Sequence, residues 1–165
     1  MKCGRFRQIR SVLHVSDNND SKSQEDSLWK VRHLFNTFKT SAPQCVNVGR
    51  NLALDECSIA SRSKYGRLFI FYNATKPTGK YHFRFYMLCC STTHILLSFK
   101  MHTYDNSDYT VVPTGQICTH EVQNSYHQQK TSALVLEMVL SYKNSGRIIN
   151  MDRYYGSCIT VMNLK

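Results

Sequence analysis

Apolar side chains recur at helical spacing in two segments near the start of the chain. The first covers residues 5–15, and basic residues fill much of its opposite face. The second begins near Ser27, with Asp26 or Ser27 as the expected N-cap, and should end before Pro43. A polar run separates the two helices and is typical of a loop. The pattern therefore predicts a helical lead-in segment over residues 1–50.

After the lead-in segment the pattern changes and favours strands. Aromatic and β-branched residues gather in short runs, and turn residues such as Pro77 and Gly79 lie between two of them. The expected strands cover residues 51–56, 68–72, 81–90, 94–102 and 147–152, and the expected helices cover residues 131–142 and 158–164. A run of strands followed by a helix and a further strand predicts an α/β fold with a mixed sheet.

The composition fits one globular domain. The chain has 165 residues, of which 42% are hydrophobic and 12% aromatic. No apolar stretch approaches the roughly 20 residues that span a bilayer, and no apolar segment follows the basic N-terminus as in a secretory signal. The seven cysteines are scattered without metal-ligand spacing, which favours a reducing compartment, mostly buried free thiols and no structural zinc.

Positive charge is the strongest signal in the composition. Lys and Arg total 21 against 11 Asp and Glu, so the formal net charge is +10. Between Cys57 and Tyr104 there is no acidic residue, and basic residues are interleaved with aromatic ones. The basic residues of this segment are Arg62, Lys64, Arg67, Lys76, Lys80, Arg84 and Lys100. Such a face can follow the phosphates of nucleic acid and stack on unpaired bases, although a solvated basic surface has the same composition.

Two acids stand out because each closes an expected strand. Asp55 follows the apolar run that begins at Asn51, and Asp152 ends the strand after the helix of residues 131–142. Functional groups of open α/β sheets gather at the carboxyl ends of strands, and one or two carboxylates suffice to bind Mg²⁺ together with substrate phosphates. The alternative is that each acid is only a strand-end or capping carboxylate.

A series of short motifs is specific through its order and spacing rather than through any single member. The motifs are residues 5–18 and 28–38, Leu54-Asp55-Glu56 with Ser61-Arg62-Ser63, Lys76-Pro77 with Lys80-Tyr81, Met87-Leu88-Cys89-Cys90, and Asp152-Arg153-Tyr154-Tyr155-Gly156-Ser157. Together they resemble the piggyBac transposase family, including its transposable element-derived proteins, over almost the whole chain. One departure is His82, which stands where the family usually has Gly.

The resemblance implies a partial RNase H-like core of the DDE/D type over residues 51–165, with DNA as partner, a homodimer as a possible assembly and the nucleus as location. Such cores use three carboxylates and two Mg²⁺ ions to cleave a DNA strand and join its end to a target. By the resemblance, Asp55 is the first catalytic, metal-binding acid and Asp152 the second. The residues implied to contact DNA are Arg62, Lys64, Lys76, Lys80 and Arg153.

Three functional hypotheses follow. In the family the third acid lies beyond the point that corresponds to Lys165, so the first hypothesis is a truncated transposase core that does not cleave DNA alone. The second is a domesticated, non-catalytic DNA-binding protein, which the net charge favours. The third is a non-functional transposon remnant with an uncovered apolar sheet face, which predicts aggregation or dependence on a partner.

Overall fold

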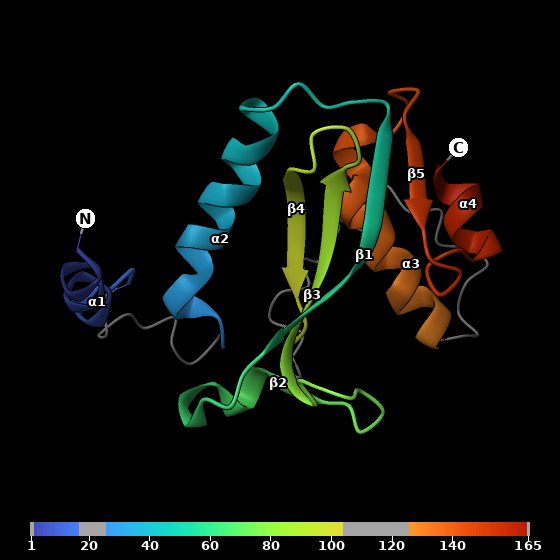
Figure 1. Cartoon of the computed structure of the whole chain (residues 1–165). Coiled ribbons are helices and arrows are strands. Elements are labelled where there is room, and N and C mark those ends of the chain that lie inside the picture. Colours follow the sequence, from blue (N-terminus) through green and yellow to red (C-terminus); the bar gives the residue numbers. More distant parts are fainter. Residues whose placement is uncertain (1, 17–25, 104–125, 165) are drawn as a thin grey trace.

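The computed structural model describes residues 2–16, 26–103 and 126–164, and its elements form a mixed sheet with helices on both faces (Figure 1). The helices are α1 (Cys3–Val12), α2 (Trp29–Ser41), α3 (Tyr126–Val139) and α4 (Cys158–Leu164), and the strands are β1 (Asn51–Ala60), β2 (Ile70–Tyr72), β3 (Tyr81–Cys90), β4 (Leu96–Met101) and β5 (Ile148–Met151). Short 3₁₀ turns η2 (Ala42–Gln44), η3 (Lys64–Phe69) and η4 (Leu140–Tyr142) connect some of them. Within the described ranges, no helix combines the length and apolar character that crossing a bilayer requires.

The central strands of the sheet are β1 and β3, which pair antiparallel along their whole length. The other edge of β3 carries β4 along its second half and the short β2 at its beginning. The other edge of β1 pairs with β5 in parallel orientation. A parallel neighbour requires a crossover connection, and α3 lies in the chain between β4 and β5. The predicted mixed α/β architecture is therefore confirmed.

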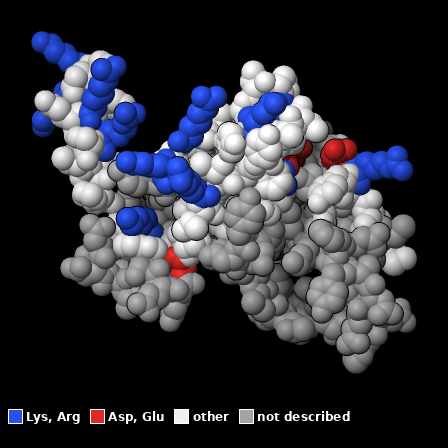
Figure 2. Space-filling model, turned by 90° about the horizontal axis from the view of Figure 1, so that it is seen from below, with Lys and Arg blue, Asp and Glu red and all other residues white. Residues whose placement is uncertain are grey.

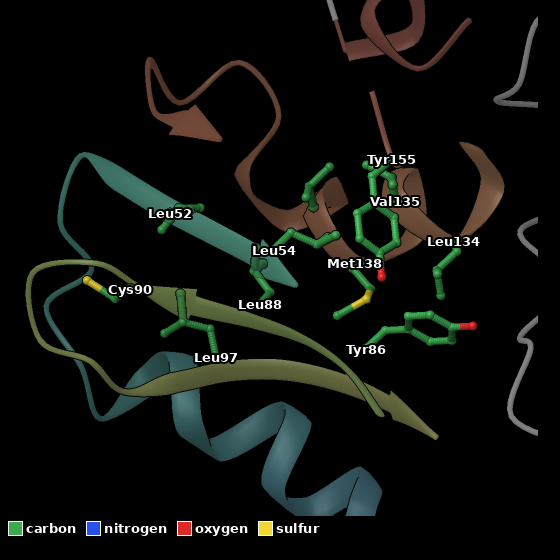
Figure 3. Packing of buried hydrophobic residues seen from close by; sticks show 11 residues of the cluster. Leu52, Leu54, Tyr86, Leu88, Cys90, Leu97, Leu134, Val135, Met138 and Tyr155 are labelled. Carbon is green, nitrogen blue, oxygen red and sulfur yellow. The ribbon is translucent and has the colours of Figure 1, made fainter. Parts of the chain in front are cut away.

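One face of the sheet packs against α3 and forms the core (Figure 3). Its sheet side comes from alternate residues of β1 and β3, including Leu54 and Leu88, as the period of two along a strand requires. Its helix side includes Val135 and Val139, which are fully buried. Full burial of each such side chain contributes roughly 1.5–3 kcal/mol. Apolar burial between the sheet and α3 therefore holds β1 in place.

The opposite face is covered near β4 by α2, which lies beside that strand in Figure 1. Phe35 and Phe38 of α2 contact the ring of Phe99 on β4, with centroids 4.8 and 5.5 Å apart. The apolar stripe expected for this helix therefore has an aromatic partner on the sheet. Since α2 packs on the sheet, the lead-in segment and the strands share a contact surface.

Some boundaries differ from the expected ones. α2 has Leu28 at its N-cap, and Asp26 instead accepts a hydrogen bond from the Leu28 amide at 2.9 Å and pairs with Arg32 at 2.7 Å. β1 runs beyond its expected end, because Ser58 and Ala60 continue the ladder with β3. α3 begins at Tyr126, before the expected start of this helix at residue 131, and residues 104–125 lie outside the described ranges.

The expectation of mostly buried cysteines is wrong for the part of the chain that the structure describes. Five cysteines are described there as free thiols. Only Cys90 among them is buried, at the end of β3, where its sulfur accepts a hydrogen bond from the Gly49 amide at 3.3 Å. Cys3 and Cys45 are exposed, because α1 and the chain after α2 contribute no buried side chain there.

Candidate functional site

Asp55 and Asp152 lie side by side on neighbouring parallel strands. The last paired residues of β1 and β5 are Leu54 and Met151; Asp55 is the next residue of β1, and Asp152 directly follows the end of β5. Parallel strands lie about 4.8 Å apart, and residues in the same register project to the same side of the sheet. Both acids are exposed. Residues 97 positions apart in the chain thus follow the same paired position of the sheet.

The register of β5 is fixed by polar contacts with the chain around the start of β1. Arg147 donates two hydrogen bonds at 3.1 Å, from Nε to the Gly49 carbonyl and from Nη2 to the Val48 carbonyl. Asn150 donates its side-chain amide to the Leu52 carbonyl at 3.0 Å. A slip by one residue would turn every side chain of β5 to the other face. These contacts therefore keep Asp152 in register with Asp55.

The chain after Asp152 is anchored by a buried tyrosine. Tyr155 is 3% exposed and stands edge-on to Tyr86 of β3, with ring centroids 6.4 Å apart (Figure 3). The amide of Tyr155 donates to the Asp152 carbonyl at 2.9 Å, which closes a tight turn. Burial raises the pKa of Tyr155, and the nearby Tyr86, Glu56 and Asp55 raise it further. The phenol therefore stays neutral beside the acidic pair.

Three hydroxyl groups join the same turn to α3. Ser132 of α3, Ser157 before α4 and Thr160 within α4 lie within 2.9–3.0 Å of one another, oxygen to oxygen. Ser157 also accepts a hydrogen bond from the Thr160 amide at 3.1 Å. Ser132 and Thr160 are buried, so these groups satisfy one another where water is excluded. The turn that carries Asp152 is thus held from both ends.

The acidic pair has the donor chemistry of a magnesium site. Mg²⁺ prefers hard oxygen ligands and is often held by one or two carboxylates, with water and substrate phosphate completing the shell. Asp55 and Asp152 match that requirement for one ion. No group of three or more His, Cys, Asp or Glu side chains suited to a metal occurs among the described residues. A two-metal site would therefore need a further donor.

A second polar group, which the sequence analysis missed, lies next to Asp55 on β1. Glu56 faces Arg84 of β3 at 3.3 Å and accepts a hydrogen bond from Ser58 at 3.2 Å. The guanidinium of Arg84 lies 3.6 Å above the ring of Phe71. Successive side chains of a strand point to opposite faces, so Glu56 and Asp55 lie on opposite faces of the sheet. The partner of Glu56, Arg84, is identified only by the pairing of β1 with β3. This group positions β1 from the face opposite to Asp55.

The basic residues predicted to contact DNA occupy several places. Arg62 and Lys64 follow β1 and are exposed, and Lys80 is exposed before β3. Lys76 is half-buried and donates to the Ser58 hydroxyl at 2.6 Å, so it is part of the polar group around Glu56. Arg153 is exposed directly after Asp152. The structure therefore brings only Arg153 next to the acidic pair in sequence and space.

Basic side chains outnumber acidic ones on the surface that Figure 2 shows. Figure 2 shows blue side chains spread over this face and few red ones. The segment from residue 57 to residue 104 contributes positive charge without any acid. Two basic residues of this segment pair with acids, Arg84 with Glu56 and Lys100 with Glu137. Arg62, Arg67 and Lys80 of this segment are exposed, as contact with a polyanion requires.

Comparisons with known proteins agree with the motif analysis. A family profile described as Transposase IS4 matches residues 1–165. The cryo-EM structure of a piggyBac transposase synaptic complex with hairpin DNA matches with a TM-score of 0.72 and 21% identity, over 99% of this chain and 30% of that one. No curated protein matches. The fold is thus that of part of a piggyBac transposase, as the motifs predicted, and the chain spans about a third of its length.

Proposed function

The chain belongs to the Transposase IS4 family, and we propose that its Asp55–Asp152 pair contributes two carboxylates to the Mg²⁺ site of a DNA strand-cleaving and strand-transferring core. The observation that supports the proposal is the register of β1 and β5, in which both acids directly follow the pair of Leu54 and Met151. When bound there, Mg²⁺ supplies a Lewis acid that polarises a phosphate and activates an attacking oxygen.

The roles of the surrounding residues follow from their positions. The carboxylates of Asp55 and Asp152 would bind the ion. Each is oriented by a hydrogen bond from the next backbone amide, that of Glu56 to Asp55 and that of Arg153 to Asp152. Arg153, exposed beside the pair, is positioned to attract the phosphate backbone of DNA. Tyr155 and the hydroxyl groups behind it keep the Asp152 turn rigid, which matters because small misplacements of a reacting group cost on the order of 10²-fold in rate.

We further propose that the 165-residue chain does not cleave DNA by itself. The described residues offer two carboxylates where a two-metal mechanism uses more donors. Purified chain incubated with supercoiled plasmid and Mg²⁺ should leave the plasmid intact. Nicking that depends on Mg²⁺ and disappears in Asp55→Ala would overturn this part of the proposal, while it would support the role of Asp55.

Affinity cleavage tests the metal site without requiring turnover. Fe²⁺ with ascorbate, used in place of Mg²⁺, generates hydroxyl radicals that cut DNA near the bound ion. Cutting of bound DNA should be local, and it should be lost in Asp55→Asn and in Asp152→Asn. The Glu56→Gln variant is the matched control, because Glu56 is adjacent but faces Arg84. Equal cutting by all four proteins would overturn the assignment.

A second candidate function is DNA binding without catalysis, and the net charge of +10 favours it. It predicts binding that needs no metal and weakens steeply with salt. For both functions the proposal takes DNA as the partner and the nucleus as the location. Sedimentation of the DNA complex would show whether a second copy of the chain joins it. Metal-dependent affinity cleavage separates the two functions, since only the first requires the acidic pair to bind an ion.

A further inference from the structure

A pocket of about 620 Å³ opens at the far end of β1, away from the acidic pair. Its walls come from the chain after β1, from β2 and from the first residue of β3. The polar and aromatic side chains that line it are Ser61, Ser63, Arg62, Arg67, Tyr72 and Tyr81. Two guanidinium groups, two hydroxyl groups and two aromatic rings thus converge on one cavity.

The two tyrosines form an exposed aromatic surface. Tyr72 and Tyr81 are directly paired across β2 and β3, and their ring centroids lie 4.9 Å apart with planes tilted by 40°. Each is 52% exposed. Exposed aromatic rings on a sheet are platforms on which nucleic-acid bases stack, and every base has a face suited to this contact. Bases inside a duplex are already stacked, so such a platform favours an unpaired one.

The two arginines supply the complementary charge. Arg62 and Arg67 are exposed, and the structure gives neither of them an acidic partner in its described ranges. A guanidinium forms bidentate hydrogen bonds with phosphate. Ser61 and Ser63 add hydroxyl groups of the kind that contact phosphate and sugar. The base and the phosphate of a nucleotide therefore each have side chains of matching chemistry in the pocket.

The pocket is built into the fold rather than formed by a loose loop. The Ser61 amide donates to the Tyr81 carbonyl at 3.0 Å, which joins the wall after β1 to β3. At Gly66, a Cβ atom would lie 2.9 Å from Cζ of Phe83, so the turn that carries Arg67 packs directly on β3. The backbone that carries the lining residues is consequently anchored to the sheet.

The distance from the pocket to the acidic pair suits a continuous DNA strand. Ser61 lies six residues after Asp55, and a strand rises about 3.3 Å per residue, which gives about 20 Å. One strand of B-DNA advances 3.4 Å per nucleotide, so this span corresponds to about six nucleotides. A strand bound at Asp55 can therefore reach the pocket along β1.

We propose that this pocket binds one unpaired nucleotide of a DNA strand, with its base on Tyr72 and Tyr81 and its phosphate at Arg62 and Arg67. The inference rests on the proposed function in taking DNA as the ligand, and it adds a nucleotide subsite about six positions from the reacting phosphate. It requires no cleavage, so binding alone tests it.

The test compares two DNA duplexes that differ in one unpaired nucleotide. The full 165-residue chain should bind the duplex with a single unpaired thymidine about tenfold more tightly than the fully paired duplex, as base–aromatic stacking predicts. Tyr72→Leu and Tyr81→Leu should abolish that preference and leave affinity for the paired duplex unchanged. Tyr72→Phe and Tyr81→Phe should preserve it, because the ring remains. Tyr154→Leu is the control for a tyrosine that is exposed elsewhere.

Each outcome decides between the inference and the function on which it rests. Binding of both duplexes with equal affinity overturns the pocket assignment while DNA binding stands. No binding of either duplex overturns both. A preference that survives in the leucine variants places the unpaired nucleotide elsewhere and also overturns the inference. If free thymidine monophosphate competes at the concentration of the oligonucleotide, the pocket is a mononucleotide site rather than a strand subsite.

Discussion

Tyr155 stands perpendicular to Tyr86, with the two ring planes at 88° and the centroids 6.4 Å apart. This contact joins the turn after β5 to the centre of the sheet, since Tyr86 belongs to β3 and both rings are buried. Asp152 begins that turn. An aromatic pair therefore determines where the second acid of the candidate site lies.

Truncation of this tyrosine should destabilise the fold. Replacement of a buried aromatic side chain by alanine typically costs about 3–5 kcal/mol, so Tyr155→Ala should lower the free energy of unfolding by that order. Tyr154→Ala is the matched control. Because Tyr154 is 69% exposed, this variant should change the free energy of unfolding by less than about 0.5 kcal/mol. Urea denaturation followed by circular dichroism measures both. Similar losses in the two variants would contradict the anchoring role.

A buried ion pair joins β4 to α3 and makes a second prediction. Lys100 is 2% exposed, and its ammonium group pairs with Glu137. Removal of one partner leaves a buried charge unpaired and typically costs about 3–5 kcal/mol, so Glu137→Ala should be strongly destabilising. The double variant Lys100→Met/Glu137→Leu should recover most of that loss. If the double variant is as unstable as Glu137→Ala, the loss of stability comes from altered packing rather than from the unpaired charge.

Stability should fall in mild acid because of His102. Burial lowers the pKa of His102 below its ordinary value of 6.5, and the positive charge of Arg84 lowers it further. The unfolded chain then binds the proton more readily than the folded one, so this stabilisation is complete above about pH 6.5 and is lost as the pH falls. The free energy of unfolding, measured from pH 8 to pH 5, should decrease below pH 6.5.

The variant His102→Gln should weaken this dependence on pH, because it removes the group whose pKa differs between the two states. His94→Gln is the control for an exposed histidine. A pH profile that is unchanged by His102→Gln would assign the acid sensitivity to other groups. The effect does not depend on DNA or metal, so it can be measured on the protein alone.

DNA affinity should depend on salt through the exposed cations after β1. For duplex DNA the slope of log affinity against log salt is about −0.9 per neutralised phosphate. The triple variant Arg62→Gln/Lys64→Gln/Lys80→Gln should therefore flatten the slope by up to about 2.7. The control triple Arg10→Gln/Arg50→Gln/Lys143→Gln removes the same charge from exposed sites elsewhere. Equal slopes in the two triples would mean that net charge alone, and not this surface, determines binding.

The sequence predicted elements well where the local pattern and the tertiary structure agree. β3 (Tyr81–Cys90) and α4 (Cys158–Leu164) have the expected bounds, because alternation or helical spacing runs unbroken between turn residues. β1 was expected to end at Glu56 but continues to Ala60. Cys57 and Ser58 interrupt the apolar run after Glu56, and this part of the chain is identified as a strand only by its pairing with β3.

The candidate site could be predicted only in part. Asp55 and Asp152 were identified from their positions next to apolar runs, and their joint role stays a prediction. Their register depends on contacts such as Arg147 with the Gly49 carbonyl, which join residues 98 positions apart and leave no local pattern. The tyrosine-lined pocket was missed for the same reason, since Tyr72 and Tyr81 belong to different expected strands.

Divalent-cation affinity tests the central claim, that Asp55 and Asp152 form one metal site, most directly. Mn²⁺ can replace Mg²⁺, and its binding to the 165-residue chain with bound DNA can be followed by electron paramagnetic resonance. Loss of groups behind a metal ligand already costs about 10–100-fold in affinity, so Asp55→Asn and Asp152→Asn should each weaken binding at least about tenfold.

The double variant should be little weaker than either single variant, because the two acids act on the same ion. Glu56→Gln, whose carboxylate faces Arg84, should bind Mn²⁺ like the unaltered chain. Mn²⁺ affinity that is unchanged in both asparagine variants, or lowered only by Glu56→Gln, would contradict the assignment of the acidic pair as the metal site.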